Sequence, residues 1–239
     1  EGTAELVGVA AGPIHGIRPA DHPDVDHWAA ACEQTLTRAE DMTQSSCGRK
    51  VVPDYVTMSV PPDVTRSLSV VVSSQRRNAS RGVAFDEVRA LLQRGYRKAQ
   101  DTVRVRPSSA AEDFIFGSVA QMALDGQAVT DPSGLRGEQL ELRMSFCLAP
   151  VQWTRALEVV AERLELDLTA IVPEHAGYAS TLPEPRALLI LLDEHQTSLC
   201  MVRRGRLEWS ASLEIGEREI IHGAAGALDI HPRQAGALM

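Results

Sequence analysis

Several features are scarce in this chain of 239 residues, and each scarcity excludes a class of protein. No apolar run approaches the ~18 residues that a membrane-spanning helix needs. No basic segment followed by an apolar one opens the chain, so we expect no signal peptide. The formal net charge of -8 argues against general nucleic-acid binding, which needs a basic surface. Hydrophobic content of 44% with 23% charged residues instead indicates a soluble globular protein.

Cysteine is also sparse and widely spaced. The four cysteines are Cys32, Cys47, Cys147 and Cys200. None of them forms a C-x-x-C pair, so the sequence does not support a zinc site or a redox pair, and we expect no metal site. Cys147 and Cys200 lie in apolar strand patterns, which predicts small buried side chains. This usage fits a reducing, cytoplasmic location.

Hydrophobic patterning predicts alternating strands and helices. Strands are predicted at residues 6–11, 55–60, 68–72, 114–122, 140–148, 168–172, 188–192, 198–203 and 207–213. Helices are predicted at residues 24–41, 85–102, 150–164, 174–182 and 217–228. Asp24 is predicted to cap the first helix, and residues 44–50 to form a polar loop. Residues 188–192 are all apolar, which predicts a strand buried on both faces.

The order of elements divides the chain into three parts, and the fold class is mixed α/β. Residues 68–173 run strand, helix, strand, strand, helix, strand, which is typical of a small α+β layer with two helices on one sheet. We expect this module to be inserted between an N-terminal α/β piece, residues 1–67, and a C-terminal one, residues 174–239. An insertion at a surface turn is well tolerated, because the ends of a compact domain often lie close together.

Four stretches carry a family resemblance. They are Asp125-Gly126-Gln127 with D-P-S-G-L-R-G-E-Q-L-E at 131–141, the helix 153–164 with Leu166-Asp167-Leu168, the strand 188–192 with Arg204-Gly205-Arg206-Leu207, and the segment 5–16. The first is the most specific. Together they resemble FtsA, the actin-like protein of bacterial cell division, over nearly the whole chain.

The resemblance implies an actin-like (ribonuclease H-like) core whose usual lower outer subdomain is replaced by the 68–173 module, the SHS2-like 1C module of the family. Residues 1–67 would begin subdomain 1A, and residues 174–239 would return to the core and begin subdomain 2A. A cytoplasmic scaffold of the divisome is then expected, held at the inner face of the membrane by its partners. Those partners would be other FtsA-like subunits and division proteins. The family's FtsZ-contacting surface and membrane helix lie beyond residue 239, so this stretch is expected to contain no membrane anchor.

The resemblance also implies a nucleotide site at the turn after residue 192, where the family has a glycine-rich hairpin. Backbone N–H groups that point at phosphate need φ > 0 and close approach, which glycine permits. Residues 193–198 read Asp-Glu-His-Gln-Thr-Ser and contain no glycine. The degenerate nucleotide contacts would be Asp193, Gln196 and Thr197. The family's first phosphate hairpin precedes residue 6, so ATP and magnesium would need segments outside this sequence. We expect no bound cofactor, no catalytic residue and no enzymatic activity.

Basic residues gather late on the 85–102 helix and just beyond it. They are Arg94, Arg97, Lys98, Arg104 and Arg106. A basic edge of a small module can dock an acidic partner. In the family, the corresponding module contacts later division proteins and neighbouring subunits. We therefore predict that these five residues bind a protein partner.

Three functions stay open at this point. The first is an FtsA-like scaffold with a degenerate ATP site. The second is a fragment of an ATP-binding actin-like division ATPase. The third is an adaptor resembling PilM of type IV pilus assembly, which shares the fold and binds a short peptide of a membrane partner. The D-G-Q and D-P-x-G-x-x-G runs favour FtsA over PilM.

Overall fold

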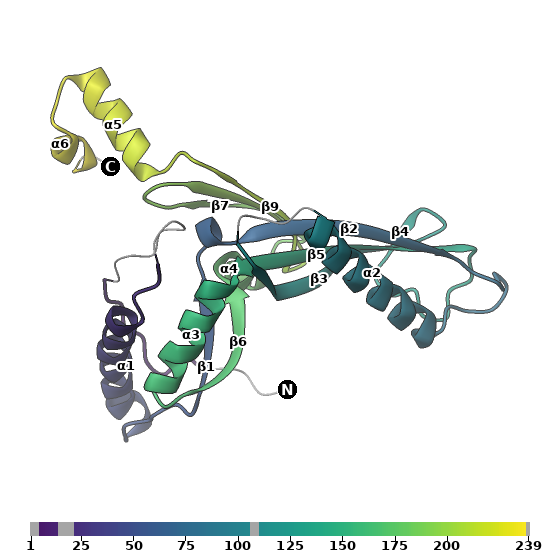
Figure 1. Cartoon of the computed structure of the whole chain (residues 1–239), viewed down its shortest axis with the longest axis horizontal. Coiled ribbons are helices and arrows are strands. Elements are labelled where there is room, and N and C mark those ends of the chain that lie inside the picture. The colour runs from purple at the N-terminus through teal and green to yellow at the C-terminus, as the bar shows by residue number, and fades with distance from the viewer. Residues whose placement is uncertain (1–4, 14–21, 106–109, 238–239) are drawn as a thin grey trace.

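Three sheets and the helices around them make an elongated molecule (Figure 1). The computed structural model describes residues 5–13, 22–105 and 110–237. The helices are α1 (Val25–Cys47), the 3-10 turn η1 (Pro62–Val64), α2 (Phe85–Val105), α3 (Val151–Arg163), α4 (Glu174–Thr181), α5 (Glu217–Leu228) and α6 (Pro232–Gly236). The strands are β1 (Tyr55–Val60), β2 (Arg66–Gln75), β3 (Glu112–Leu124), β4 (Gln127–Val129), β5 (Gln139–Pro150), β6 (Asp167–Pro173), β7 (Arg186–Leu192), β8 (Thr197–Arg203) and β9 (Arg206–Leu213).

The largest sheet is antiparallel, with strand order β2-β5-β3-β4, and α2 packs on one of its faces. Alternate residues of β5 point at α2, and the core between them includes Leu91, Leu142 and Phe146. The β3–β4 hairpin turns at Asp125 and Gly126, whose φ values are 51° and 78°. Positive φ at both central residues is typical of a type I′ hairpin turn, for which Asp-Gly is a favoured pair. The Asp-Gly pair of the FtsA-like run therefore has a structural role.

A second unit forms where β1 pairs in parallel with β6 and α3 packs against α1. Its core is built around Trp28 of α1 and Trp153 of α3, whose ring centroids lie 4.9 Å apart. The prediction of two helices on one sheet across residues 68–173 is therefore wrong in detail. The expected fourth strand, β6, pairs with β1 instead, so the large sheet ends in the short β4. The apolar side of α3 is buried in the core that it shares with α1 and β1. The predicted domain boundaries stay predictions.

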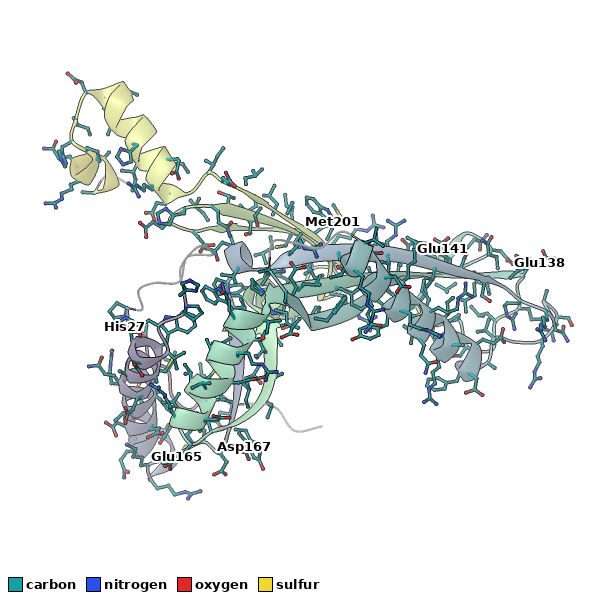
Figure 2. All side chains as sticks on the ribbon, viewed as in Figure 1. His27, Glu138, Glu141, Glu165, Asp167 and Met201 are labelled. Atoms are coloured by element: carbon teal, nitrogen blue, oxygen red, sulfur yellow. The ribbon has the colours of Figure 1, made fainter. Side chains whose placement is uncertain are left out.

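The third sheet, β7-β8-β9, is buried on only one face. Cys200 and Val202 are fully buried on the inner face, whereas Leu188 is 59% exposed on the outer face. Strand register places Met201 and Trp209 beside Leu188, and Met201 is labelled on this sheet in Figure 2. The prediction that residues 188–192 are buried on both faces is therefore wrong. An antiparallel sheet commonly has only one buried face, and here the exposed face is apolar as well.

The N-terminal predictions hold only in part. The Asp24 cap is confirmed, since its Oδ1 accepts the N–H of His27 at 3.0 Å. The predicted strand at residues 6–11 is wrong, because this segment lies along α1 with its carbonyls bound by α1 side chains, as in the 2.9 Å bond from Ser46 Oγ to the Val7 carbonyl. The loop predicted to begin at residue 44 begins later. The helix continues to Cys47 and ends at Gly48, whose φ of 72° makes it a left-handed C-cap.

Candidate functional site

The turn between β7 and β8 closes on itself and on the segment after β9. The Asp193 N–H donates to the carbonyl of Gln196 at 2.8 Å, and Thr197 Oγ1 donates to the carbonyl of Ile215 at 2.6 Å. Gln196 is buried, and its Nε2 has no hydrogen-bond partner in the described part of the chain. Burial raises the pKa of the Asp193 carboxyl. The three residues predicted to contact nucleotide thus share one turn.

Helix α5 begins directly against this turn. The N–H of Glu217 donates to the carbonyl of Asp193 at 2.9 Å, and the N–H of Arg218 donates to that of Glu194 at 3.0 Å. A Cβ on Gly216 would lie 2.4 Å from the carbonyl carbon of His195, so this approach requires glycine. Free N–H groups at a helix start are what binds anions. Here the carbonyls of the turn already accept two of them.

The turn does not fit a nucleotide phosphate as it stands. A phosphate cradle uses successive N–H groups turned to one point by residues with positive φ, and none of residues 193–198 has positive φ. Carboxylates also gather here. The pKa of Asp63 is raised by burial first and then by the nearby charges of Asp193 and Glu174. A phosphate would meet this negative charge, and Asp193, Gln196 and Thr197 stay a prediction as nucleotide contacts.

The predicted basic residues divide between two surfaces. Arg94, Arg97 and Lys98 line one groove beside β2. Arg104, further along α2, faces a different cleft and lies 3.9 Å from the carboxylate of Asp101. Arg106 lies outside the described residues. The partner role assigned to all five stays a prediction, but the structure brings only the first three together.

The cleft that Arg104 faces is a site that sequence reasoning missed. It has a volume of about 780 Å³ and lies between α2 and β3 on one side and α3 and β6 on the other. Its apolar lining includes Phe114, Ile115 and Ile171. Because its walls come from elements far apart in sequence, no local motif marks it.

Hydrogen-bonded acids line the polar side of this cleft. Thr154 Oγ1 donates to Asp113 Oδ2 at 2.6 Å. Glu112 accepts hydrogen bonds from both Nε and Nη2 of Arg66, the first at 2.9 Å. Glu158 accepts a hydrogen bond from Arg155 at 2.7 Å. The carboxylates are thus held in fixed positions by hydrogen bonds from neighbouring side chains. Fixed acceptors beside an apolar wall suit a peptide segment that has apolar side chains and backbone N–H donors.

Residues 5–13, 22–105 and 110–237 were considered for metal ligands and for membrane-spanning helices as parts of the described structure. No three His, Cys, Asp or Glu side chains gather there in a way that could hold a metal ion. In the same ranges, no helix combines the length and the apolar character needed to cross a bilayer.

His175 gives a prediction for stability. It is 1% exposed beside a cavity of about 260 Å³, and neither ring nitrogen has a hydrogen-bond partner among the described residues. Burial lowers its pKa from 6.5 to about 4. The unfolded chain therefore binds a proton near pH 6.5, whereas the folded chain does so only near pH 4. Stability should fall as the pH drops through this window.

Urea midpoints measured from pH 8 to about pH 4 test this expectation for the parent chain and for His175→Phe. The difference in midpoint between the two should change across the window, with the variant losing less stability on acidification. A constant difference would show that His175 does not titrate as its burial requires.

The arrangement of sheets and helices assigns this protein to a fold class. The predicted fold class, a mixed α/β fold of the actin-like type, is confirmed by structural likeness to a solved structure. No protein-family model and no curated protein matches the sequence.

Particular solved structures resemble this chain to different degrees. A chain of the "PilM-PilN type IV pilus biogenesis complex" matches with a TM-score of 0.52 and 12% identity, over 94% of this chain and 58% of that one. A Bacteroides thetaiotaomicron protein with an actin-like ATPase fold and unknown function gives a TM-score of 0.33 and 8% identity, and the match covers 85% of this chain and 63% of that one. The cytoplasmic domain of EpsL, an inner-membrane component of the Vibrio cholerae type II secretion system, gives a TM-score of 0.34 and 10% identity. That match covers 86% of this chain and 61% of the EpsL chain. At 12% identity the likeness to the PilM–PilN neighbour shows the fold alone, and this chain spans 58% of that neighbour.

Proposed function

We propose that this chain is part of an adaptor of actin-like fold that recruits a protein partner in type IV pilus assembly, as a PilM-like protein. The observation that carries the proposal is the cleft of about 780 Å³ between the α2–β3 and α3–β6 walls. The partner would be a segment of a PilN-type protein, since the structure that this fold matches over 94% of the chain is a PilM–PilN complex.

The shape and lining of the cleft support a peptide ligand. Phe114 and Ile171 offer apolar contact area, and the acids at its rim accept N–H groups of an extended chain. The two walls of the cleft come from two packed units, the large sheet with α2 and the unit that contains α3 and β6. This placement also favours ligand recognition, because ligand sites form preferentially where domains meet. The closed turn at 193–198 supports an adaptor over the ATPase alternative.

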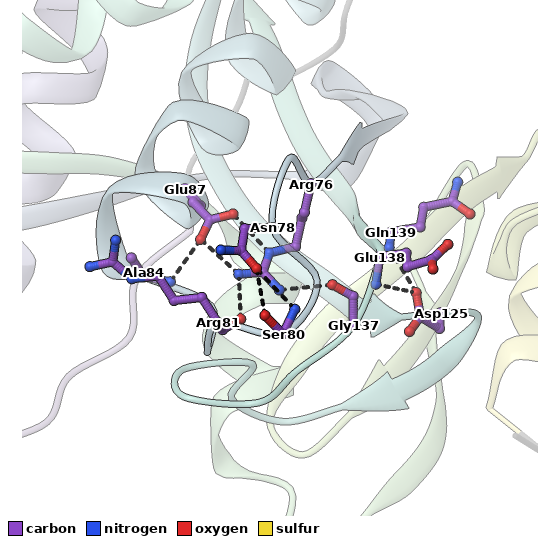
Figure 3. Close-up of polar contacts among 10 residues, drawn as sticks. All are labelled: Arg76, Asn78, Ser80, Arg81, Ala84, Glu87, Asp125, Gly137, Glu138 and Gln139. Carbon is purple, nitrogen blue, oxygen red and sulfur yellow. Dashed lines mark hydrogen bonds and ion pairs between the residues drawn. The ribbon is translucent and has the colours of Figure 1, made fainter.

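A division scaffold is the second candidate, and the FtsA-like run from Asp125 to Glu141 favours it. Asp125 Oδ1 accepts the N–H groups of Glu138 and Gln139 at 2.9 and 2.7 Å, which joins the β3–β4 turn to the start of β5 (Figure 3). The residues of the run therefore build the far end of the module, where Figure 2 labels Glu138 and Glu141. This structural role of the run is compatible with either adaptor role.

Direct binding separates these candidates. The chain is titrated, by fluorescence anisotropy, with the labelled cytoplasmic segment of a PilN-type protein and with the cytoplasmic segments of late division proteins. Saturable binding of the pilus segment alone is the expected result. Preferred binding of a division segment would replace the first candidate by the second, and saturable micromolar binding of labelled ATP with magnesium would favour the ATPase alternative.

Two variants locate the binding site. Ala170 is exposed and lines the cleft, so Ala170→Trp should obstruct part of the cleft without entering the core and weaken binding at least about tenfold. Gln152 is an exposed residue of α3 that does not line the cleft, and Gln152→Trp is the matched control. Equal loss in both variants, or in neither, would place the ligand elsewhere.

A further inference from the structure

We propose that the free edge of β2 is a second docking surface, which takes an extended acidic segment of a partner protein as an added β-strand. This surface lies along β2 and α2 and is separate from the cleft described above. We define it by the residues that line its groove: Val71, Val72, Ser73, Arg94, Arg97, Lys98 and Asp101.

Strand order and register expose the main chain of β2. The order β2-β5-β3-β4 leaves β2 at the edge of the sheet. At its end the N–H of Arg76 donates to the carbonyl of Glu138 at 2.7 Å, which continues the register with β5. Even-numbered residues of β2 therefore direct their main-chain groups to β5. Since successive residues of a strand alternate, Ser69, Val71 and Ser73 direct theirs outward.

Long basic side chains of α2 partly occupy this edge. Lys98 Nζ donates to the carbonyl of Val71 at 2.8 Å, and Arg94 Nη2 donates to the carbonyl of Ser73 at 3.1 Å. Both side chains are exposed. Among the described residues, the outward N–H groups of Val71 and Ser73 have no protein partner. The edge thus offers unpaired donors, together with acceptors that only flexible side chains cover.

The groove beside this edge is basic and has room for a chain. Its volume is about 420 Å³. Its three cations are Arg94, Arg97 and Lys98, and its one acid, Asp101, lies 3.9 Å from Arg104. The whole chain carries a net charge of -8, so this groove is a local reversal of the overall sign. A negatively charged partner is therefore attracted to this face more than to the rest of the surface.

These features together specify the partner chemistry. An extended segment can donate to the carbonyls of Val71 and Ser73 and accept from their N–H groups, as added strands do at exposed sheet edges. Arg94 and Lys98, once displaced from those carbonyls, can pair with carboxylates that alternate along the segment. Within the described part of the chain, the Arg97 guanidinium donates only to the carbonyl of Gln93 in its own helix, at 3.4 Å, so it is available for the same role.

The test uses a fluorescein-labelled peptide of alternating glutamate and valine, titrated against the full chain. Its lysine–valine counterpart and a version with proline at alternate positions are the comparison peptides, since proline removes the N–H groups that an added strand needs. Only the first peptide is expected to bind. Amide exchange at Val71 and Ser73 should slow at least about tenfold in the complex.

Three variants complete the design. The double variant Arg97→Glu with Lys98→Glu should weaken binding at least about tenfold, whereas Arg89→Glu, an exposed arginine of α2 outside the groove, should not. Val71→Pro removes an outward N–H without breaking the ladder to β5 and should also abolish binding. Thermal melting confirms that each variant is folded.

Several results would overturn the proposal: equal binding of the proline peptide, unchanged exchange at Val71 and Ser73, equal loss in Arg89→Glu, or no binding of the acidic peptide. None of these results bears on the cleft, which Ala170→Trp tests separately.

Discussion

Replacing Trp153 by alanine is expected to lower the free energy of unfolding by about 4 kcal/mol. The side chain is 2% exposed and packs against Trp28 with a ring-centroid distance of 4.9 Å and an interplanar angle of 44°. It also packs in one cluster with Val60 of β1 and Val160 of α3. Removing it would open a cavity where α1, α3 and the β1–β6 pair meet, and two of these elements, α3 and β6, also form one wall of the cleft.

Urea denaturation followed by circular dichroism measures this loss, with Trp209→Ala as the matched control. Trp209 is 47% exposed on the outer face of β9, so its removal should cost less than about 1 kcal/mol. Trp153→Phe keeps a ring in the cluster and should fall between the two. Equal losses for Trp153→Ala and Trp209→Ala would contradict the assignment of Trp153 to the core of this unit.

The sequence predicts elements well where the pattern is local. Residues 140–146 alternate between apolar and polar, and β5 forms there with the apolar residues turned toward α2. The stripe on residues 85–102 and the acids in its first turn likewise predict α2. Asp24 caps α1 for an equally local reason, since its side chain reaches an N–H only three residues on. Each of these outcomes depends on neighbours within a few turns or one strand.

Patterns of this kind do not say which sheet a strand joins. Nothing in residues 167–173 indicates that β6 pairs with β1, whose residues lie more than one hundred positions earlier. The apolar run at 188–192 misleads for a related reason: alternate residues of β7 are exposed although they are apolar. Apolar residues of a strand are buried only where another element covers their face of the sheet. The order of residue types does not show which faces are covered.

The same limit applies to the candidate sites. Arg94, Arg97 and Lys98 are spaced at three and four residues, so helical geometry alone predicts that they share a face. Arg104 lies further along α2 and belongs to the cleft instead. The cleft needs both of its walls, and their meeting depends on the β1–β6 pairing that the sequence does not reveal.

Replacing Arg76 by methionine is expected to cost about 3 kcal/mol, although the residue lies in a loop at the far end of the module. Its side chain is 3% exposed, and its guanidinium makes four hydrogen bonds (Figure 3). Two go to the carboxylate of Glu87, at 2.8 and 3.0 Å, and one each to the carbonyls of Gly137 and Arg81, at 2.8 and 3.0 Å. Methionine would leave these acceptors without their donor while keeping most of the apolar volume.

The pH dependence of the loss distinguishes this ion pair from simple packing. Hydrogen bonds from Arg76, and then from the N–H of Ala84, lower the pKa of Glu87 from 4.5 to about 2. The pair therefore stabilises the fold above about pH 4.5, and that contribution is lost as the pH falls toward 2. Urea midpoints should show the parent chain and Arg76→Met converging over this window.

Arg155→Met, which breaks the exposed pair with Glu158, is the control and should change stability by less than about 0.5 kcal/mol. Adding Glu87→Gln to Arg76→Met should recover part of the loss, because the unpaired carboxylate is then gone. A loss that stays constant with pH and is not eased by the second substitution would mean that Arg76 acts through packing alone.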